Sequence, residues 1–153
     1  MNRNFIFVFI LLTTLSIVNS IPFNKRKADF YPCYQVINPI PGVDVTISPD
    51  PPVAKTPEHF TVSGTLKHDI TADKTLLNID FFDGLRFVSM ITPYNKKFNE
   101  SVKAGTKFSI DVNNVPTPEL PSFYDIHVTV GEKPDKNGDL QDEFGCSRSD
   151  FST

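Results

Sequence analysis

The chain has 153 residues, a length that suits one domain, and carries 15 basic against 18 acidic side chains, a net charge of −3. This acidic balance argues against a nucleic acid as the partner, because binding to phosphates needs a basic face. The first 20 residues contain one basic residue and no acid, so the chain without them is slightly more acidic still.

The N-terminus has the pattern of a secretory signal. Arg3 precedes an apolar block from Phe5 to Leu12, and Val18-Asn19-Ser20 offers tolerated residues at the spacing that a signal peptidase needs. A membrane anchor would need roughly 20 apolar residues, and polar residues interrupt this stretch from position 13 onward. We therefore expect 1–20 to be a signal peptide. The remainder would then be extracellular, or in the lumen of the secretory and endolysosomal pathway.

The cysteines and one sequon fit that compartment. Cys33 and Cys146 are an even pair, which favours a disulfide in an oxidising environment, with two unrelated thiols as the alternative. Asn99 begins the sequon Asn-Glu-Ser, which suits an exposed glycosylated loop, although such sequons also arise by chance. The basic run from Lys25 to Lys27 is either a processing site or part of a flexible N-terminal segment, 21–32, and we favour the flexible segment.

Alternation of apolar and polar residues predicts strands that each bury one face. The predicted strands are 43–48, 60–66, 75–82, 106–112 and 124–130. The stretch 86–92 is apolar without clean alternation, so its inward face cannot be assigned. A last short strand would hold Phe144 and Cys146.

Prolines and polar runs separate these strands. The cluster from Pro49 to Pro52 ends the first strand and turns the chain to another edge or layer, because proline cannot donate to a ladder. A second proline-rich bridge runs over 116–121. We expect loops over 67–74, 93–100 and 131–143, with tight turns at the Asp-Gly and Asn-Gly pairs beginning at positions 83 and 137. About seven evenly spaced strands without helical period predict an all-β, immunoglobulin-like antiparallel sandwich of two sheets.

An antibody-type domain fits less well, because the chain has no tryptophan and its two cysteines are too far apart in sequence. The stretches 47–52, 60–66, 98–110 and 115–121 instead resemble, in order and spacing, the ML lipid-recognition family. The fungal phosphatidylglycerol/phosphatidylinositol transfer proteins are the most similar members, and the cholesterol carrier of Niemann–Pick disease belongs to the same family. The resemblance spans 33–153 as one domain, with its matched positions between Cys33 and Cys146.

The resemblance implies a secreted sandwich whose sheets hold a lipid in an apolar cavity between them. It also implies a disulfide that joins the first and last strands, which Cys33 and Cys146 would form. Two departures are visible in this sequence. The extra cysteine pairs of many members are absent, so the cavity mouth would be less constrained. The segment 147–153 is too polar for a long last strand, so we expect one frayed edge.

The inward faces would then contact the lipid. Burial of each CH₂ of an acyl chain gains about 0.8 kcal/mol, so few polar contacts would be needed. The predicted lipid-binding residues are Phe60, Val62, Leu66, Leu77, Ile79, Phe81, Phe108, Ile110, Ile126, Val128 and Val130. A filled core alternates in the same way. The alternative to a carrier of phospholipid or sterol is therefore a secreted adhesion or effector module that recognises a protein or glycan through its outer surface.

Four lysines, Lys96, Lys97, Lys103 and Lys107, could contact anionic headgroups or, transiently, a membrane surface, or could be scattered solvated side chains. Nothing in the sequence supports catalysis: His127 is predicted on an outward face, and no G-x-S-x-G nucleophile motif occurs. The acidic run that begins at Asp135 fails the EF-hand pattern, since its twelfth position is Cys146. We thus expect a monomer that is not an enzyme and has neither cofactor nor metal.

Overall fold

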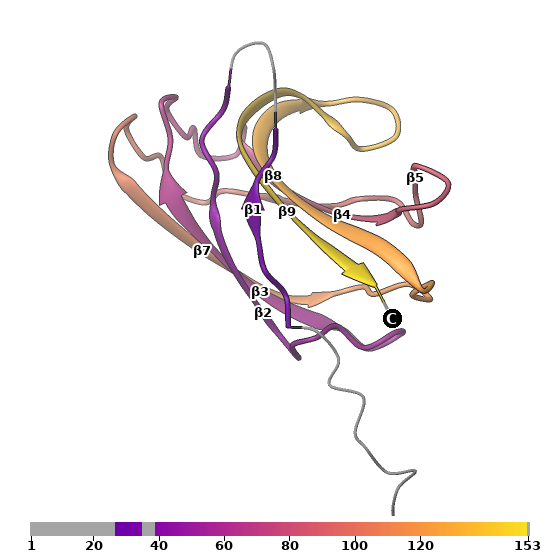
Figure 1. The fold of residues 1–153 in the computed structure, drawn as a ribbon. Helices are drawn as coiled ribbons and strands as arrows, with labels where there is room; N and C mark the ends of the chain where they lie inside the picture. The colour runs from indigo at the N-terminus through magenta and orange to yellow at the C-terminus, as the bar shows by residue number, and fades with distance from the viewer. Residues whose placement is uncertain (1–26, 35–38, 153) are drawn as a thin grey trace, which may run out of the picture.

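The computed structural model describes residues 27–34 and 39–152, and within them the chain forms nine strands and no helix. The strands are β1 (Tyr31–Pro32), β2 (Asp44–Ser48), β3 (Glu58–Thr65), β4 (Leu76–Asp83), β5 (Val88–Ser89), β6 (Tyr94–Lys97), β7 (Lys107–Val115), β8 (Phe123–Pro134) and β9 (Leu140–Ser152). They form two antiparallel sheets that face each other (Figure 1), which confirms the predicted all-β sandwich. The predicted signal segment and the basic pair Lys25-Arg26 lie outside the described residues. In the described part, no helix has the length and hydropathy needed to cross a bilayer.

The two sheets differ in size. The six-stranded sheet has the order β1-β9-β8-β4-β5, and β6 pairs with β4. The three-stranded sheet has the order β2-β3-β7. The long pairing of β4 with β8, from Leu76 opposite Gly131 to Asp83 opposite Tyr124, forms the middle of the larger sheet. Its apolar side chains meet those of β3 and β7 in one core.

The last strand is longer than the sequence predicted, and the expected frayed edge is wrong. β9 lies between β1 and β8. Its polar side chains have hydrogen-bond partners elsewhere in the fold. The buried hydroxyl of Ser147 accepts a hydrogen bond from the N–H of Val43 at 2.9 Å and donates one to its carbonyl at 2.7 Å. The hydroxyl of Ser149 accepts from the N–H of Asp29 at 3.1 Å. Satisfied hydroxyls let a Ser-rich strand lie inside a sheet.

Two predicted loops are partly strands. The segment 93–100 contains β6, whose four residues pair with the first half of β4. The segment 131–143 is mostly the ends of β8 and β9, which leaves a turn over 135–139. Asp135 Oδ1 accepts the N–H groups of Asn137, Gly138 and Asp139 at 2.7–3.2 Å. Asp135, the first residue of the acidic run, therefore stabilises the turn of the β8–β9 hairpin.

The two cysteines form a disulfide, with their Cα atoms 5.4 Å apart. The backbone N–H of Cys33 also donates to the carbonyl of Cys146 at 3.1 Å, beside the short β1–β9 pairing. The predicted neighbourhood of the first and last strands is thus confirmed. The residues before β1 contact the other sheet. The N–H of Ala28 donates to Oδ1 of Asp50, a residue that follows β2, at 2.8 Å. This segment covers one side of the sandwich.

Candidate functional site

The residues predicted to contact lipid lie in the core between the sheets. Ten of the eleven are at most 4% exposed, and Ile110 is half-buried against the same cluster. Six of them are 0% exposed: Phe60, Val62, Leu77, Ile126, Val128 and Val130. These six side chains are therefore packed inside the core.

One end of the sandwich, formed by 66–76 and 97–107, is closed by backbone pairing. Ile70 and Val102 exchange two backbone hydrogen bonds of 2.8 and 3.0 Å. The N–H of Asp73 donates to the carbonyl of Phe98 at 2.9 Å, and the N–H of Phe98 donates to Thr75 at 3.1 Å. The buried Phe98 ring also meets a core ring edge to face, which fills the space beneath. We call this region the closed end.

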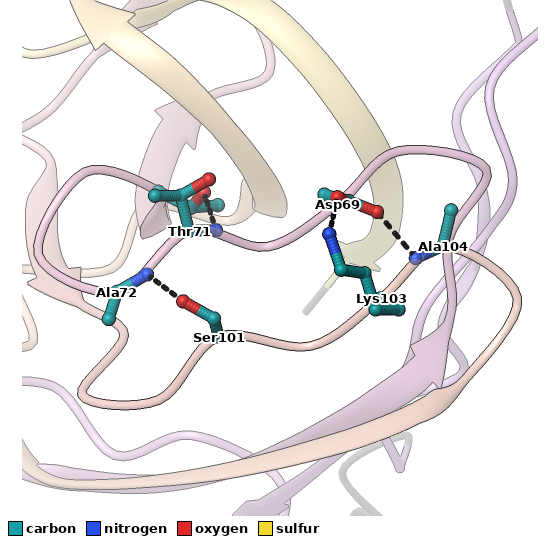
Figure 2. Close-up of polar contacts among 7 residues, drawn as sticks. Asp69, Thr71, Ala72, Ser101, Lys103 and Ala104 are labelled. Carbon is teal, nitrogen blue, oxygen red and sulfur yellow. Dashed lines mark hydrogen bonds and ion pairs between the residues drawn. The ribbon is translucent and has the colours of Figure 1, made fainter.

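Side chains reinforce the closed end, as Figure 2 shows. Asp69 contacts the facing loop twice, accepting from Lys103 Nζ at 2.7 Å and from the N–H of Ala104 at 2.8 Å. These two bonds lower the pKa of Asp69. The hydroxyl of Ser101 accepts from the N–H of Ala72 at 3.0 Å. Two loops that are distant in sequence are thereby held together across this end.

The opposite end carries a pocket of about 700 Å³. It lies between the end of β4 with β5 on the larger sheet and the proline-rich bridge that follows β7 on the smaller one. The lining is mainly apolar and includes four charged residues. The lining residues are Lys55, Asp83, Arg86, Val88, Ser89, Met90, Ile91, Pro118, Glu119, Leu120 and Pro121. None of the eleven residues predicted to contact lipid is among them.

The pocket has two walls from different sheets. On one side, β5 stops after Ser89 and β6 starts at Tyr94, so Met90 and Ile91 leave the regular ladder. Met90 stays attached through its N–H, which donates to the carbonyl of Phe81 at 2.8 Å. On the other side, Leu120 lies in the bridge between β7 and β8 and is also half-buried. Half-buried apolar side chains keep surface that a ligand can cover.

Cations at the rim have weak internal partners. The ammonium of Lys55 pairs with Glu119, and both side chains are mostly exposed. The guanidinium of Arg86 lies 3.7 Å from the carboxylate of Asp83 and is also mostly exposed. An exposed pair such as Lys55 with Glu119 contributes little to stability because water screens it. Asp83 is only 14% exposed, but the Arg86 side chain itself is 82% exposed. Both cations can therefore turn toward an anionic group at the pocket mouth.

The four predicted headgroup lysines lie at the closed end. Lys97 pairs with Leu76 at the start of β4, whereas the pocket begins at Asp83. These two positions are separated by the length of an eight-residue strand, roughly 23 Å. Lys103 is held by Asp69, and Lys96 and Lys107 are exposed. A headgroup role for these lysines stays a prediction, and the pocket described above has other cations beside it.

Sequence reasoning missed the pocket because its residues lack a period. Met90 and Ile91 belong to the apolar stretch without alternation, and Leu120 stands between prolines of the second bridge. Both stretches are apolar but unsuited to a regular strand, and that combination is the signal that could have indicated the pocket. Alternation finds the core, since only regular strands place every second side chain inward.

A polar cluster on the outer face of the larger sheet is the other group of titratable residues. Asp125 and Asp150 face each other across β8 and β9. Burial, then the hydrogen bond and charge of Asp150, raise the pKa of Asp125 to about 6. Burial raises the pKa of Asp150, but hydrogen bonds from Tyr31 and Asp125 outweigh it and lower that pKa overall. The Tyr31 hydroxyl and Arg148 thereby bind this carboxylate pair into the β1–β9 edge.

His127 lies next to this cluster, on the outward face as predicted. Its ring stacks on Phe82 at 5.3 Å, and burial followed by the charge of Arg148 lowers its pKa. The described residues contain no group of three or more potential metal-ligating His, Cys, Asp or Glu side chains. Asn99, the predicted glycosylation site, is exposed at the closed end. Its modification stays a prediction.

Comparison with known proteins identifies no family. No protein-family model matches the chain, and no curated protein matches it. Among solved structures, chicken MD-1 in the crystal structure with lipid IVa is similar, with a TM-score of 0.49 and 11% sequence identity. That match covers 84% of this chain and 93% of the MD-1 chain. A similarity this distant assigns neither a family nor a ligand, so the resemblance to the ML family and its fungal transfer proteins stays a prediction.

Proposed function

We propose that the protein binds a lipid without covalent chemistry and holds its apolar part in the pocket at the end of the sandwich. The observation that carries the proposal is the pocket itself. Its volume of about 700 Å³ falls in the range of sites for small molecules, roughly 300–1,000 Å³. Met90, Ile91 and Leu120 give the pocket apolar lining, and Lys55, Asp83, Arg86 and Glu119 add charged groups to it. This arrangement suits an amphipathic ligand.

The driving force would be the burial of hydrocarbon. Each CH₂ group removed from water contributes about 0.8 kcal/mol, so part of an acyl chain or a sterol ring system binds without a specific polar partner. A headgroup would remain at the mouth, within reach of Lys55 and Arg86. Phospholipid and sterol are both candidates, because apolar walls accept either one.

The proposed role is that of a secreted carrier. The predicted signal segment is consistent with secretion, and so is a disulfide that joins the two ends of the domain. The proposal differs in one respect from the sequence-based expectation of a lipid between the two sheets. Side chains fill the middle of the core, so the pocket end is the place where a ligand finds room.

The test is native mass spectrometry after incubation with vesicles of phosphatidylcholine and cholesterol, followed by identification of any retained lipid. Wild-type protein should retain one lipid, and Ile91→Trp, which narrows the pocket, should retain much less. Tyr34→Trp adds the same ring at a fully exposed position far from the pocket and should behave as wild type. Wild-type protein that stays folded and retains no lipid would contradict the proposal.

A second candidate is recognition of a protein or glycan through the outer surface. The observation in its favour is a group of exposed apolar side chains beside the pocket, Leu85, Phe87 and Val88. A module of this kind would keep its pocket empty in the same mass spectra. It would lose partner binding when Phe87 is replaced by serine.

A further inference from the structure

The turn between β4 and β5 carries an unusual apolar surface. Leu85, Phe87 and Val88 are 69%, 76% and 52% exposed, and they lie within four consecutive residues. We call them the apolar tip. Figure 1 shows this turn at the side of the larger sheet, projecting from the body of the molecule. Scattered exposed apolar residues are ordinary, but a group of them on a projecting turn marks an interaction site.

The tip is held in place before any partner arrives. Asp83 Oδ1 accepts the N–H groups of Leu85 and Arg86 at 3.0 and 2.9 Å. The carbonyl of Asp83 accepts the N–H of Phe87 at 2.8 Å. Phe87 adopts a positive φ of 56°, which is uncommon for a bulky residue, and its side chain is exposed. A preformed turn loses little conformational freedom when it binds.

The tip is continuous with the pocket. Val88 belongs to both, and Arg86 lies in the tip turn while also lining the pocket. An apolar chain that moves from the tip into the pocket would therefore pass along apolar surface without crossing water. The closed end lies at the other end of β4, so no comparable path leads in through the paired loops there.

We propose that the apolar tip inserts into the interfacial layer of a lipid bilayer and that the membrane is the partner from which the pocket takes its ligand. The purpose of this contact rests on the proposed function, but the contact itself is measured separately. Three neighbouring side chains alone do not supply the roughly 800 Å² that each partner buries in a standard protein interface, so a protein partner would also need the surface around them. They suffice for shallow insertion, which reaches roughly 5–10 Å into the headgroup and acyl boundary.

The charges beside the tip favour a membrane with some anionic lipid. Arg86 lies between two residues of the tip, and Lys55 stands across the pocket mouth. The Lys55 and Arg86 side chains are 70% and 82% exposed; Lys55 pairs with the exposed Glu119, and Arg86 lies 3.7 Å from Asp83, whose side chain is 14% exposed. A phosphate group at the membrane surface can therefore be contacted by both cations while the tip is inserted. We expect phosphatidylglycerol in the vesicle to strengthen binding, and added salt to remove that increment.

The chain contains no tryptophan, so a single introduced tryptophan reports on one position only. Phe87→Trp should shift its emission to the blue and be quenched by brominated phosphatidylcholine vesicles. Lys97→Trp, exposed at the closed end, should show neither effect. Quenching at position 97 without quenching at 87 would overturn the proposal and favour the lysine-rich end. Quenching at neither position would overturn it as well.

A double variant separates the membrane contact from lipid binding. Leu85→Ser with Phe87→Ser should lower the vesicle partition constant by roughly tenfold or more, since two large apolar side chains are no longer buried. The same variant should still retain monomeric lysophosphatidylcholine supplied without vesicles, because neither residue lines the pocket. Unchanged vesicle binding would overturn the tip proposal alone. If wild-type protein retained no lysophosphatidylcholine, the proposed function alone would be overturned.

Discussion

Ser147 shows how one buried hydroxyl can join two sheets. It lies on β9 of the larger sheet, and both of its hydrogen bonds go to the backbone of Val43, just before β2 of the smaller sheet. Its side chain is buried, so no water can replace these bonds. The hydroxyl therefore satisfies a backbone N–H and a carbonyl that regular pairing leaves without a strand partner.

Ser147→Ala should lower the free energy of unfolding by about 1–3 kcal/mol, because the N–H of Val43 would then be buried without a partner. Urea denaturation followed by circular dichroism measures this loss. Ser109→Ala, at an exposed position on β7, is the matched control and should change stability by less than about 0.5 kcal/mol. Equal losses in the two variants would contradict the assigned role of the hydroxyl.

Asp80 is a buried carboxyl of the larger sheet. Its residue is 5% exposed, and one of its oxygens has no hydrogen-bond partner within the described structure. Burial raises its pKa to about 6, and the charge of Asp139 adds to the shift, although the hydroxyl of Ser89 donates to it at 2.6 Å. The folded state therefore binds a proton at Asp80 more tightly than the unfolded state does. The stabilisation is present near pH 4 and is lost as the pH rises through about 6.

Asp80→Asn should remove this dependence, since an amide of the same shape carries no charge. The variant should gain about 1–2 kcal/mol over wild type at pH 7.5, and the gain should shrink toward pH 4.5. The comparison is made as a difference between the two proteins. The contributions of His127 and Asp125 to the pH dependence of the free energy of unfolding are present in both proteins and therefore cancel. The lowered pKa of His127 destabilises the fold in acid, and the raised pKa of Asp125 acts in the same direction as that of Asp80. Urea midpoints at the two pH values decide it, and a gain that is independent of pH would contradict the assignment.

At the scale of elements, the regular strands follow from the sequence. Alternation predicted the strands that contain Phe60, Phe81, Phe108 and Ile126. The observed bounds of these strands differ from the predicted ones by one to four residues. Alternation works here because the inward face of each strand is apolar and the other face is mostly polar, even in β4, where Asn78 and Asp80 on the outward face are also buried. β6 was missed because Lys96 and Lys97 make its four residues polar.

The length of β9 could not be predicted from its own residues. Its serines are poor strand residues by composition, and they are stable there only because Val43 and Asp29 accept or donate hydrogen bonds across the fold. Such partners lie more than a hundred residues away in sequence. The pocket was hidden for a related reason, since its two walls come from segments that each lack a period and meet only in the folded chain.

The disulfide links β9 to the start of the domain over a sequence separation of 113 residues. Closing so long a loop restricts the unfolded chain strongly, so Cys33→Ala with Cys146→Ala should lower the free energy of unfolding by about 3–5 kcal/mol. Urea denaturation of the variant measures the loss, and wild-type protein in reducing buffer should show a similar one. A variant as stable as the oxidised protein would contradict this expectation.

At the scale of the whole molecule, the fold is a sandwich with two different ends. Paired loops seal one end around Ile70 and Val102, while the other carries the pocket and the apolar tip. The sequence predicted the sandwich and its core correctly. The prediction that the inward face contacts lipid stays a prediction, because alternation alone cannot distinguish a filled layer from a hollow one.

The lysine side chains are unevenly distributed between the two ends of the sandwich. Lys96, Lys97, Lys103 and Lys107 crowd the sealed end, whereas Lys55 alone among the described lysines lines the pocket. Random amine coupling to a sensor chip will therefore attach most molecules by their sealed end. A layer prepared this way presents the pocket end of the molecule to the flowing solution, as an oriented array that needs no engineered tag.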